Sequence, residues 1–92
     1  MAITIHIPTP LRPFVGNRDE VSIDQEGTIG AILKDLASAN DGLGKHLFNA
    51  EGQLRNFVNV YVNDEDIRYQ SGPDTAVKSG DVVSIVPSIA GG

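Results

Sequence analysis

Residues 28–39, TIGAILKDLASA, form the segment around which the rest of the sequence can be arranged. Apolar residues recur in it at intervals of three and four, which places them on one face of an α-helix. These residues are Ile29, Ile32, Leu33, Leu36 and Ala37. Thr28 is a suitable N-cap residue, and Asn40-Asp41-Gly42 ends the helix. The pattern therefore predicts one amphipathic helix with a single apolar face to bury.

Two strands are predicted before this helix. Every second residue from Ile3 to Ile7 is apolar, and the same alternation returns at Val21 and Ile23. A period of two is typical of strands that bury one face, so the two segments are expected to pair as a hairpin with a long connection. Within that connection, residues 9–13 contain two prolines and are predicted to be an irregular loop.

Three more strands are predicted after the helix. Phe57 to Asn63 is rich in β-branched and aromatic residues and is a strong strand signal. A turn at residues 63–66 leads to a short return strand at Ile67–Tyr69, and residues 82–86 form the last strand. Apolar residues occupy both faces of this last strand, which is typical of a central strand or of one that carries a binding surface.

The segment that joins the helix to Phe57 gives a weaker signal. Leu43, Leu47 and Phe48 have the spacing of one short helical turn that could close an open edge of the core, whereas Gly44 and Gly52 argue against a longer helix. A single main helix covers only one face of a five-stranded sheet, so the other face is expected to meet water or a partner.

The composition limits the classes of function. The chain has 92 residues, which predicts one domain over residues 1–92. It contains no cysteine, which excludes disulfides, thiolate metal sites and a cysteine nucleophile. The net charge of −5, without a basic stripe, argues against nucleic-acid binding. The charge suits a basic protein partner, although it could equally serve solubility alone.

The sequence also gives no sign of a membrane or secreted protein. Its uncharged apolar stretches have the length of strands, well below the roughly 20 residues that a membrane-spanning helix needs. The N-terminal residues Met1 to Ile5 include neither a basic segment nor a small-residue cleavage site. We therefore expect a cytoplasmic monomer.

No arrangement of side chains predicts an enzyme or a metal site. His6 and His46 lie far apart in the sequence and have no carboxylates around them at the spacing of metal ligands. The acidic residues 64–66 could bind a cation or a basic partner, but a polar hairpin turn explains them equally well. Gly42-Leu43-Gly44 lacks the preceding strand and the lysine of a phosphate loop. The chain is thus predicted to supply no catalytic residues of its own.

The C-terminal residues form an uncharged segment that ends in two glycines, Val86-Pro87-Ser88-Ile89-Ala90-Gly91-Gly92. Glycine has no Cβ, so a Gly-Gly end is thin and can enter a narrow active site. No charged side chain follows Asp81, which leaves the carboxylate of Gly92 as the chemical group of the tail. Residues 87–92 are predicted to be flexible, and an ordinary frayed terminus is the alternative explanation.

The whole pattern resembles the ubiquitin-like sulfur-carrier family (ThiS/MoaD type). The order strand, strand, helix, then three strands matches that family, as does the Ala90-Gly91-Gly92 end. Residues 57–68, FVNVYVNDEDIR, together with Ile7-Pro8-Thr9 and Leu11-Arg12-Pro13, resemble the carriers of thiocarboxylate-dependent cysteine biosynthesis. The resemblance implies an α+β class with a β-grasp, ubiquitin-like fold, in which a mixed five-stranded sheet packs on one main helix.

The resemblance also implies a mechanism and a set of partners. An E1-like adenylating and sulfurtransferase enzyme would use ATP to activate the carboxylate of Gly92 and convert it into a thiocarboxylate. A cysteine synthase that depends on pyridoxal phosphate would accept the sulfur, and a zinc metalloprotease would release cysteine from the carrier. This chain would hold no cofactor itself, and Ile89, Ala90 and Gly91 would form the tail that reaches the active sites.

A partner-binding surface is predicted beside the tail. In the strand Phe57–Asn63, the side chains of Phe57 and Tyr61 lie on the face opposite to Val58 and Val60. Val86 likewise points away from the core side of its strand and is followed by Pro87. The predicted partner-contacting residues are Phe57, Tyr61, Val86 and Pro87. Coverage by loops is the alternative for these positions.

Three other functions fit parts of this pattern. One is the small subunit of molybdopterin synthase or another sulfur-delivery carrier, although the position after Pro87 is Ser88 and not the second proline often found in those subunits. Another is a ubiquitin-like modifier that is joined to target proteins through Gly92. The last is a β-grasp interaction domain whose terminal glycines have no role.

Overall fold

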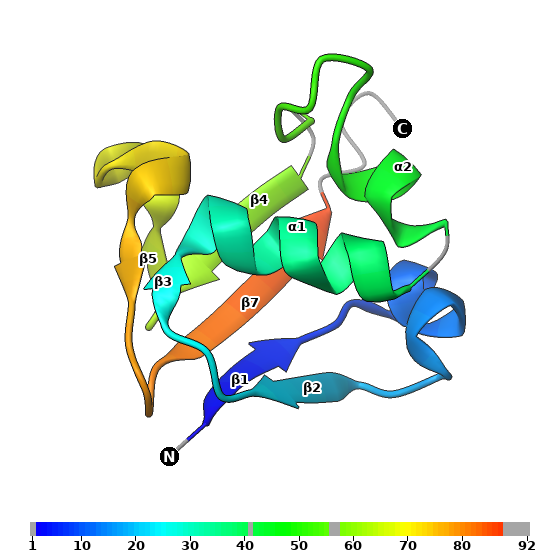
Figure 1. Cartoon of the computed structure of the whole chain (residues 1–92), viewed down its shortest axis with the longest axis horizontal. Helices are drawn as coiled ribbons and strands as arrows, with labels where there is room; N and C mark the ends of the chain where they lie inside the picture. Colours follow the sequence, from blue (N-terminus) through cyan, green and yellow to red (C-terminus); the bar gives the residue numbers. More distant parts are fainter. Residues whose placement is uncertain (1, 41, 56–57, 88–92) are drawn as a thin grey trace.

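The computed structural model describes residues 2–40, 42–55 and 58–87. Five strands form the main sheet in the order β2-β1-β7-β4-β5 (Figure 1). Their bounds are Ile3–His6 for β1, Glu20–Ile23 for β2, Val58–Val62 for β4, Glu65–Asp66 for β5 and Val82–Pro87 for β7. β1 and β7 are parallel and the other neighbours are antiparallel. The predicted mixed sheet of five strands is confirmed, with β7 at its centre.

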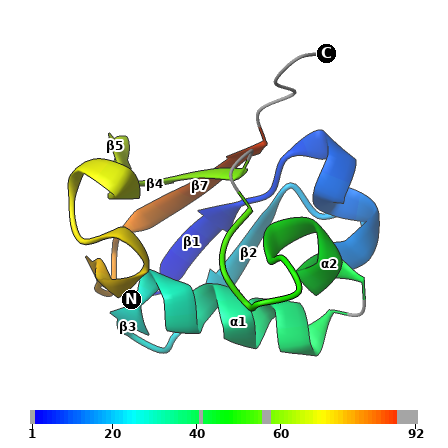
Figure 2. The same cartoon turned by 90° about the horizontal axis from the view of Figure 1, so that it is seen from above.

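One long helix covers one side of this sheet (Figure 2). The helix α1 spans Ile29–Ala39, and the Thr28 hydroxyl oxygen accepts a hydrogen bond from the Ala31 N–H at 3.3 Å. The predicted helix and its N-cap residue are therefore confirmed. A short helix, α2, spans Leu43–Leu47 and buries both of its leucines, as the spacing of those residues suggested.

The core lies between α1 and the sheet. Every second residue of β1, β4 and β7 is buried there, together with the apolar face of α1. Buried apolar residues are Ile3, Ile5, Ile7, Leu11, Val15, Val21, Ile29, Ile32, Leu33, Leu36, Leu43, Leu47, Val58, Val60, Val62, Ile67, Val77, Val83 and Ile85. The other face of the sheet, which we call the outer face, carries Thr4, His6, Asn59, Tyr61, Val82, Ser84 and Val86.

A second, two-stranded sheet anchors the start of α1, and the sequence did not predict it. β3, Gly27–Thr28, pairs with β6, Ala76–Val77, in an antiparallel register. The Ile29 N–H donates to the Thr75 carbonyl at 2.9 Å, which extends the contact to the first residue of the helix. Strands of two residues carry too little alternation to be recognised from sequence.

The prediction of an irregular loop after β1 was wrong. Residues Thr9–Val15 form a 3₁₀ helix, η1, in which Leu11 and Val15 are buried in the core. Proline is compatible with the first positions of a helix because its φ is already near the helical value. Gly16, at φ +68°, ends the helix, and its N–H donates to the Arg12 carbonyl. Pro10 thus lies at the start of this helical segment, and Pro13 lies inside it.

The return strand predicted at Ile67–Tyr69 lies two residues earlier. Asn63 and Asp64 both have positive φ, 52° and 70°, which makes a two-residue turn and lets pairing resume at β5, Glu65–Asp66. The Asp66 side chain then accepts the Arg68 N–H at 2.9 Å and starts a 3₁₀ turn, η2, at Ile67–Tyr69. A further 3₁₀ turn, η3, follows at Gly72–Asp74.

Asp81 joins the start of β7 to the turn that follows β4. Its carboxylate accepts the Lys78 N–H at 2.9 Å and the Asn63 side-chain amide at 3.0 Å. The Asn63 side-chain oxygen accepts the Val82 N–H at 3.0 Å. The hydrogen bond from the Lys78 backbone, followed by that from Asn63, lowers the pKa of Asp81 below its ordinary 3.8. This network fixes β4 and β7 relative to each other.

These hydrogen bonds predict how stability depends on pH. Because the pKa of Asp81 is lower in the folded state, its stabilising contribution is complete above the unfolded value of 3.8 and is lost as the pH falls through the folded pKa. Asp81→Asn should therefore lower the Tm near pH 7, and the gap to the unmodified protein should close towards pH ~2. Thermal unfolding followed by circular dichroism across this range measures the gap. A gap that is independent of pH would contradict the role assigned to the carboxylate.

Candidate functional site

The tail residues predicted from the sequence, Ile89 to Gly92, lie outside the described residues. The structure describes the strand that precedes the tail, and we call the end of this strand the base of the tail. That base is the end of β7, which includes Pro87, one residue farther than predicted. Val58 is the register partner of Pro87, and Val86 pairs with Asn59. β7 is held between β1 on one side and β4 on the other. The tail therefore follows directly from the central strand of the sheet.

The outer face places apolar side chains next to this base. Tyr61 stands opposite Ser84 of β7, so that its diagonal neighbours on that strand are Val82 and Val86. Val86 is 46% exposed and Val82 is 38% exposed, whereas Tyr61 is half-buried. Tyr61 and Val86 thus share the outer face, as predicted. Pro87 does not join them, because it is the register partner of the buried Val58 and falls on the core side of β7. Phe57 lies outside the described residues. We call Tyr61, Val82 and Val86 the apolar patch.

Val82 belongs to this patch, although it was not predicted as a contact residue. A partial signal was available, because apolar residues on both faces of residues 82–86 are typical of a central strand or of one that carries a binding surface. What was missing was the register, which brings Val82 within diagonal reach of Tyr61. Sequence alone gives the face of a strand but not its alignment with a neighbour.

Polar residues border the apolar patch on both sides. In one row across the sheet, Glu20, His6, Ser84, Tyr61 and Asp66 follow one another on neighbouring strands. The His6 Nδ1 lies 3.8 Å from a carboxylate oxygen of Glu20, at a distance that forms an ion pair when the imidazole is protonated. An apolar centre with a polar rim is the arrangement found in protein–protein interfaces.

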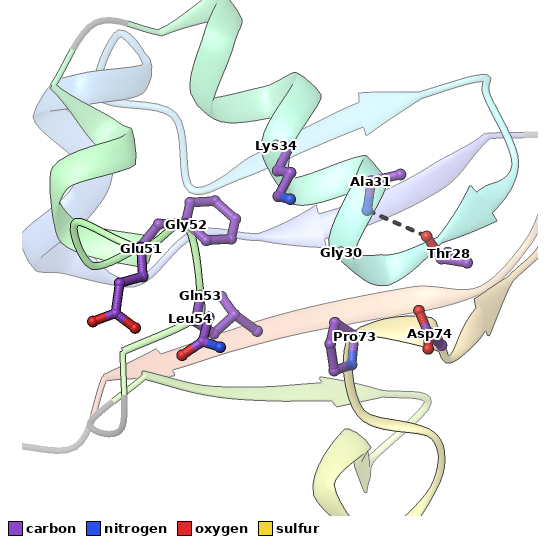
Figure 3. A pocket seen from close by; sticks show the side chains of 11 residues that line it. Thr28, Gly30, Ala31, Lys34, Glu51, Gly52, Gln53, Leu54, Pro73 and Asp74 are labelled. Carbon is purple, nitrogen blue, oxygen red and sulfur yellow. Dashed lines mark hydrogen bonds between the residues drawn. The ribbon is translucent and has the colours of Figure 1, made fainter.

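A separate hollow lies away from the apolar patch. A groove of about 740 Å³ opens between the start of α1, residues 48–54 and η3 (Figure 3). Lys34 and Ala31 form one wall, and Pro73 approaches so closely that a Cβ on Gly30 would lie 3.0 Å from it. None of Tyr61, Val86 and Pro87 lines this groove. It therefore forms no part of the predicted partner surface.

Each of the two histidines lies beside one neighbouring side chain. The ring of His46 packs on Phe14 with 4.6 Å between the ring centroids, and His6 faces Glu20. Among residues 2–40, 42–55 and 58–87, no group of three or more metal-ligating side chains is close enough to hold a metal ion. Within the same residues, no helix is both long and apolar enough to span a membrane.

Comparison with known proteins relates the chain to one family over nearly its whole length. The model of the ThiS family matches residues 5–92. The sulfur carrier protein CysO of Mycobacterium tuberculosis (strain H37Rv) is 44% identical over 94 residues, and the alignment covers all of both chains. The small archaeal modifier protein 3 of Haloferax volcanii is 36% identical over 93 residues, again with complete coverage of both.

The fold is shared with a solved complex. A chain in the crystal structure of the Amycolatopsis orientalis BexX/CysO complex superposes with a TM-score of 0.86 and 41% identity, covering 99% of this chain and all of that one. The predicted β-grasp, ubiquitin-like fold is thereby confirmed. The similarity also shows that a protein of this shape forms a complex with a partner called BexX.

Proposed function

Because this chain belongs to the ThiS family of sulfur carrier proteins, we propose that it carries sulfur as a thiocarboxylate on Gly92 and delivers it for cysteine biosynthesis. The observation that carries the proposal is the full-length similarity to CysO at 44% identity, in a chain that ends in Gly91-Gly92. The absence of cysteine supports it, since no side-chain thiol can hold the sulfur. In the proposed mechanism, the terminal carboxylate of Gly92 takes this role, as the similarity to the family implies.

The chemistry requires activation by a partner. A carboxylate is a poor electrophile, so the partner would transfer AMP from ATP to Gly92 and release pyrophosphate. A sulfur donor would then attack the acyl adenylate, displace AMP and leave a thiocarboxylate. The sulfur of that group is nucleophilic and can be passed to an acceptor. ATP is the substrate of the adenylating enzyme, and this chain is proposed to bind no cofactor.

The partners proposed for this cycle are the E1-like adenylating and sulfurtransferase enzyme, a cysteine synthase that depends on pyridoxal phosphate, and a zinc metalloprotease. The apolar patch is proposed to dock the adenylating enzyme, and Phe57 and Pro87 are proposed as further contact residues. Its support is its position, because Val86 precedes the end of β7 by one residue and is 46% exposed. An enzyme that grips this patch holds the base of the tail in a fixed direction.

Mutation of the apolar patch tests the docking step. Tyr61→Ala or Val86→Asp should weaken the binding of the adenylating enzyme about tenfold, because central interface residues commonly contribute more than ~1 kcal/mol. Isothermal titration calorimetry with the purified enzyme measures the change. Tyr69→Ala is the matched control, since Tyr69 is 89% exposed and lies in η2.

The same variants should leave the fold nearly unchanged. Val86 is exposed and Tyr61 lies on the outer face, so the Tm of each variant is expected to stay within a few degrees of the unmodified protein. A large fall in Tm would show that these side chains serve packing. Unchanged affinity with unchanged Tm would place the docking surface elsewhere.

A second candidate function is protein modification through Gly92. The observation that favours it is the 36% identity to the small archaeal modifier protein 3 over the full chain. Intact mass spectrometry separates the two functions, using untagged protein isolated from cells that also produce the adenylating enzyme. A carrier gains the mass difference between sulfur and oxygen. A modifier appears joined to lysines of other proteins, and lysine conjugates without a thiocarboxylate would overturn the carrier proposal.

A further inference from the structure

A second groove of about 490 Å³ runs between β2 and α1. Its floor is apolar and is made by Val21 and Ile23 of β2 and by Ile32 and Leu36 of α1. β2 and α1 run in opposite directions (Figure 1), and the groove lies along both of them. Its shape suits an extended chain segment that lies along the strand.

One wall of this groove is an open edge of the main sheet. β2 is the outermost strand, and β1 is its neighbour within the sheet. The Ile7 N–H donates to the Asp19 carbonyl at 2.8 Å. In an antiparallel pair of strands, hydrogen-bonded and non-hydrogen-bonded residue pairs alternate, so the next hydrogen-bonded pair between β1 and β2 is Ile5 with Val21. The N–H and C=O groups of Glu20 and Ser22 must then point away from β1. They form a ladder that can accept another strand.

The opposite edge of the sheet is closed to such pairing. β5 has two residues and leads directly into the 3₁₀ turn at Ile67–Tyr69. Very short edge strands are one of the ways in which proteins prevent pairing with another chain. β2 has four residues, twice as many, and stands beside an apolar groove. In the described part of the main sheet, β2 is thus the edge suited to adding a strand.

The charges around the groove select the occupant. Asp24 and Asp35 stand at its rim, with Glu20 on the outer side of β2, and Arg18 lies at the far end, where its Nε donates to the Val15 carbonyl. A second copy of this chain would bring the same acidic side chains of both edges together, and like charges on paired strands are destabilising. A partner with lysine or arginine gains from the same groups.

We infer that this groove binds an extended, basic segment of a partner protein as an additional strand beside β2. Side chains of such a strand alternate between its two sides. One set, which is apolar, would pack on Val21, Ile23, Ile32 and Leu36, and the other set, lysine or arginine, would face Glu20. This surface is distinct from the apolar patch and does not depend on the thiocarboxylate. The carrier could therefore hold one partner at each site.

The test uses the full chain labelled with ¹⁵N and a blocked hexapeptide of alternating lysine and valine. On titration, amide resonances of β2 and of the facing side of α1 should shift, with the largest changes at Glu20 and Ser22. A second peptide carries the same side chains, with N-methyl groups on every residue. It keeps the side-chain contacts but blocks backbone pairing, so it should bind at least tenfold more weakly if a strand is added.

A pair of charge reversals tests the acidic rim. Asp24→Lys with Asp35→Lys should weaken binding of the peptide about tenfold at low salt, because both substitutions replace attraction of the peptide lysines by repulsion. The matched control is Glu51→Lys with Asp74→Lys, which makes the same change in net charge at the groove of Figure 3. This control should bind within about twofold of the unmodified protein.

Several results would overturn the inference. Shifts confined to Tyr61 and Val86 would assign the peptide to the apolar patch, and shifts around Lys34 would assign it to the other groove. Equal affinity of the N-methylated peptide would exclude strand addition. Dimerisation of the chain through β2, seen by sedimentation, would replace the partner with a second copy. No detectable binding at millimolar peptide also rejects it, and sulfur loading of Gly92 is unaffected by any of these outcomes.

Discussion

Removal of Gly91 and Gly92 is expected to abolish sulfur loading and to leave the folded domain intact. The acceptor carboxylate then belongs to Ala90, two residues closer to the sheet, so it should not reach the activated phosphate in the partner's active site. Each extended residue spans about 3.3 Å, and misplacement by ~1 Å already costs about a hundredfold in rate. Loading should therefore fall by at least 10²-fold, measured as the thiocarboxylate peak in intact mass spectra.

The truncated chain also separates docking from chemistry. Its β7 still ends at Pro87, and all the buried apolar residues of the core precede that end in the sequence, so its Tm should match that of the unmodified protein. It should compete with the full-length carrier for the adenylating enzyme, because the apolar patch is retained. Truncated protein that still gains sulfur would show that Gly92 is not the site. Truncated protein that neither loads nor competes would show that the tail itself provides the binding energy.

The elements predicted from sequence are those whose signal is local. The period of three and four in residues 28–39 and the period of two in β1, β4 and β7 report burial directly, since each repeat reflects one buried face. Thr28 as N-cap residue follows from the same local logic. The parallel pairing of β1 with β7 joins segments almost eighty residues apart, and no local pattern specifies it.

The segments that were predicted wrongly depend on distant contacts. Leu11 and Val15 are four residues apart, and it is their burial under the core that makes η1 helical. Likewise, the side chain of Ile67 is only 4% exposed, and it lies in the 3₁₀ turn η2. The burial of this side chain directs the chain towards the core, whereas a continued strand would have followed the edge of the sheet. Prolines and short polar runs permit several conformations, and tertiary packing chooses among them.

In the candidate site, too, the residues with a local signal were predicted and those that depend on distant contacts were not. Tyr61 and Val86 were identified because alternation assigns each to the face opposite the core. Val82 required the strand register, and the groove between β2 and α1 required two segments that are distant in sequence. Gly92 and the tail were identified from the chemistry of a free carboxylate and from similarity to the ThiS family. Their role as the sulfur-carrying end is a proposal.

Leu33→Ala is expected to cause the largest loss of stability among simple substitutions in α1. Leu33 is 0% exposed and lies in the middle of the helix face that packs on the sheet. Truncation of a buried leucine removes its burial and leaves a cavity, which together cost about 3 kcal/mol. For a domain of this size the Tm should fall by more than ~10 °C. Thermal and urea unfolding both measure the change, and Lys34→Ala, the exposed neighbour, should shift stability by less than ~0.5 kcal/mol.

The same variant tests whether the domain acts only as a rigid base for the tail. Leu33 lies on the helix side of the sheet, opposite to the apolar patch, so Leu33→Ala changes no predicted contact with the adenylating enzyme. Below its lowered Tm the variant should therefore load sulfur at the normal rate, and above it loading should fail in step with unfolding. Slow loading at a temperature where the variant is fully folded would contradict this, because it would mean that packing beneath the sheet controls how the outer face is presented.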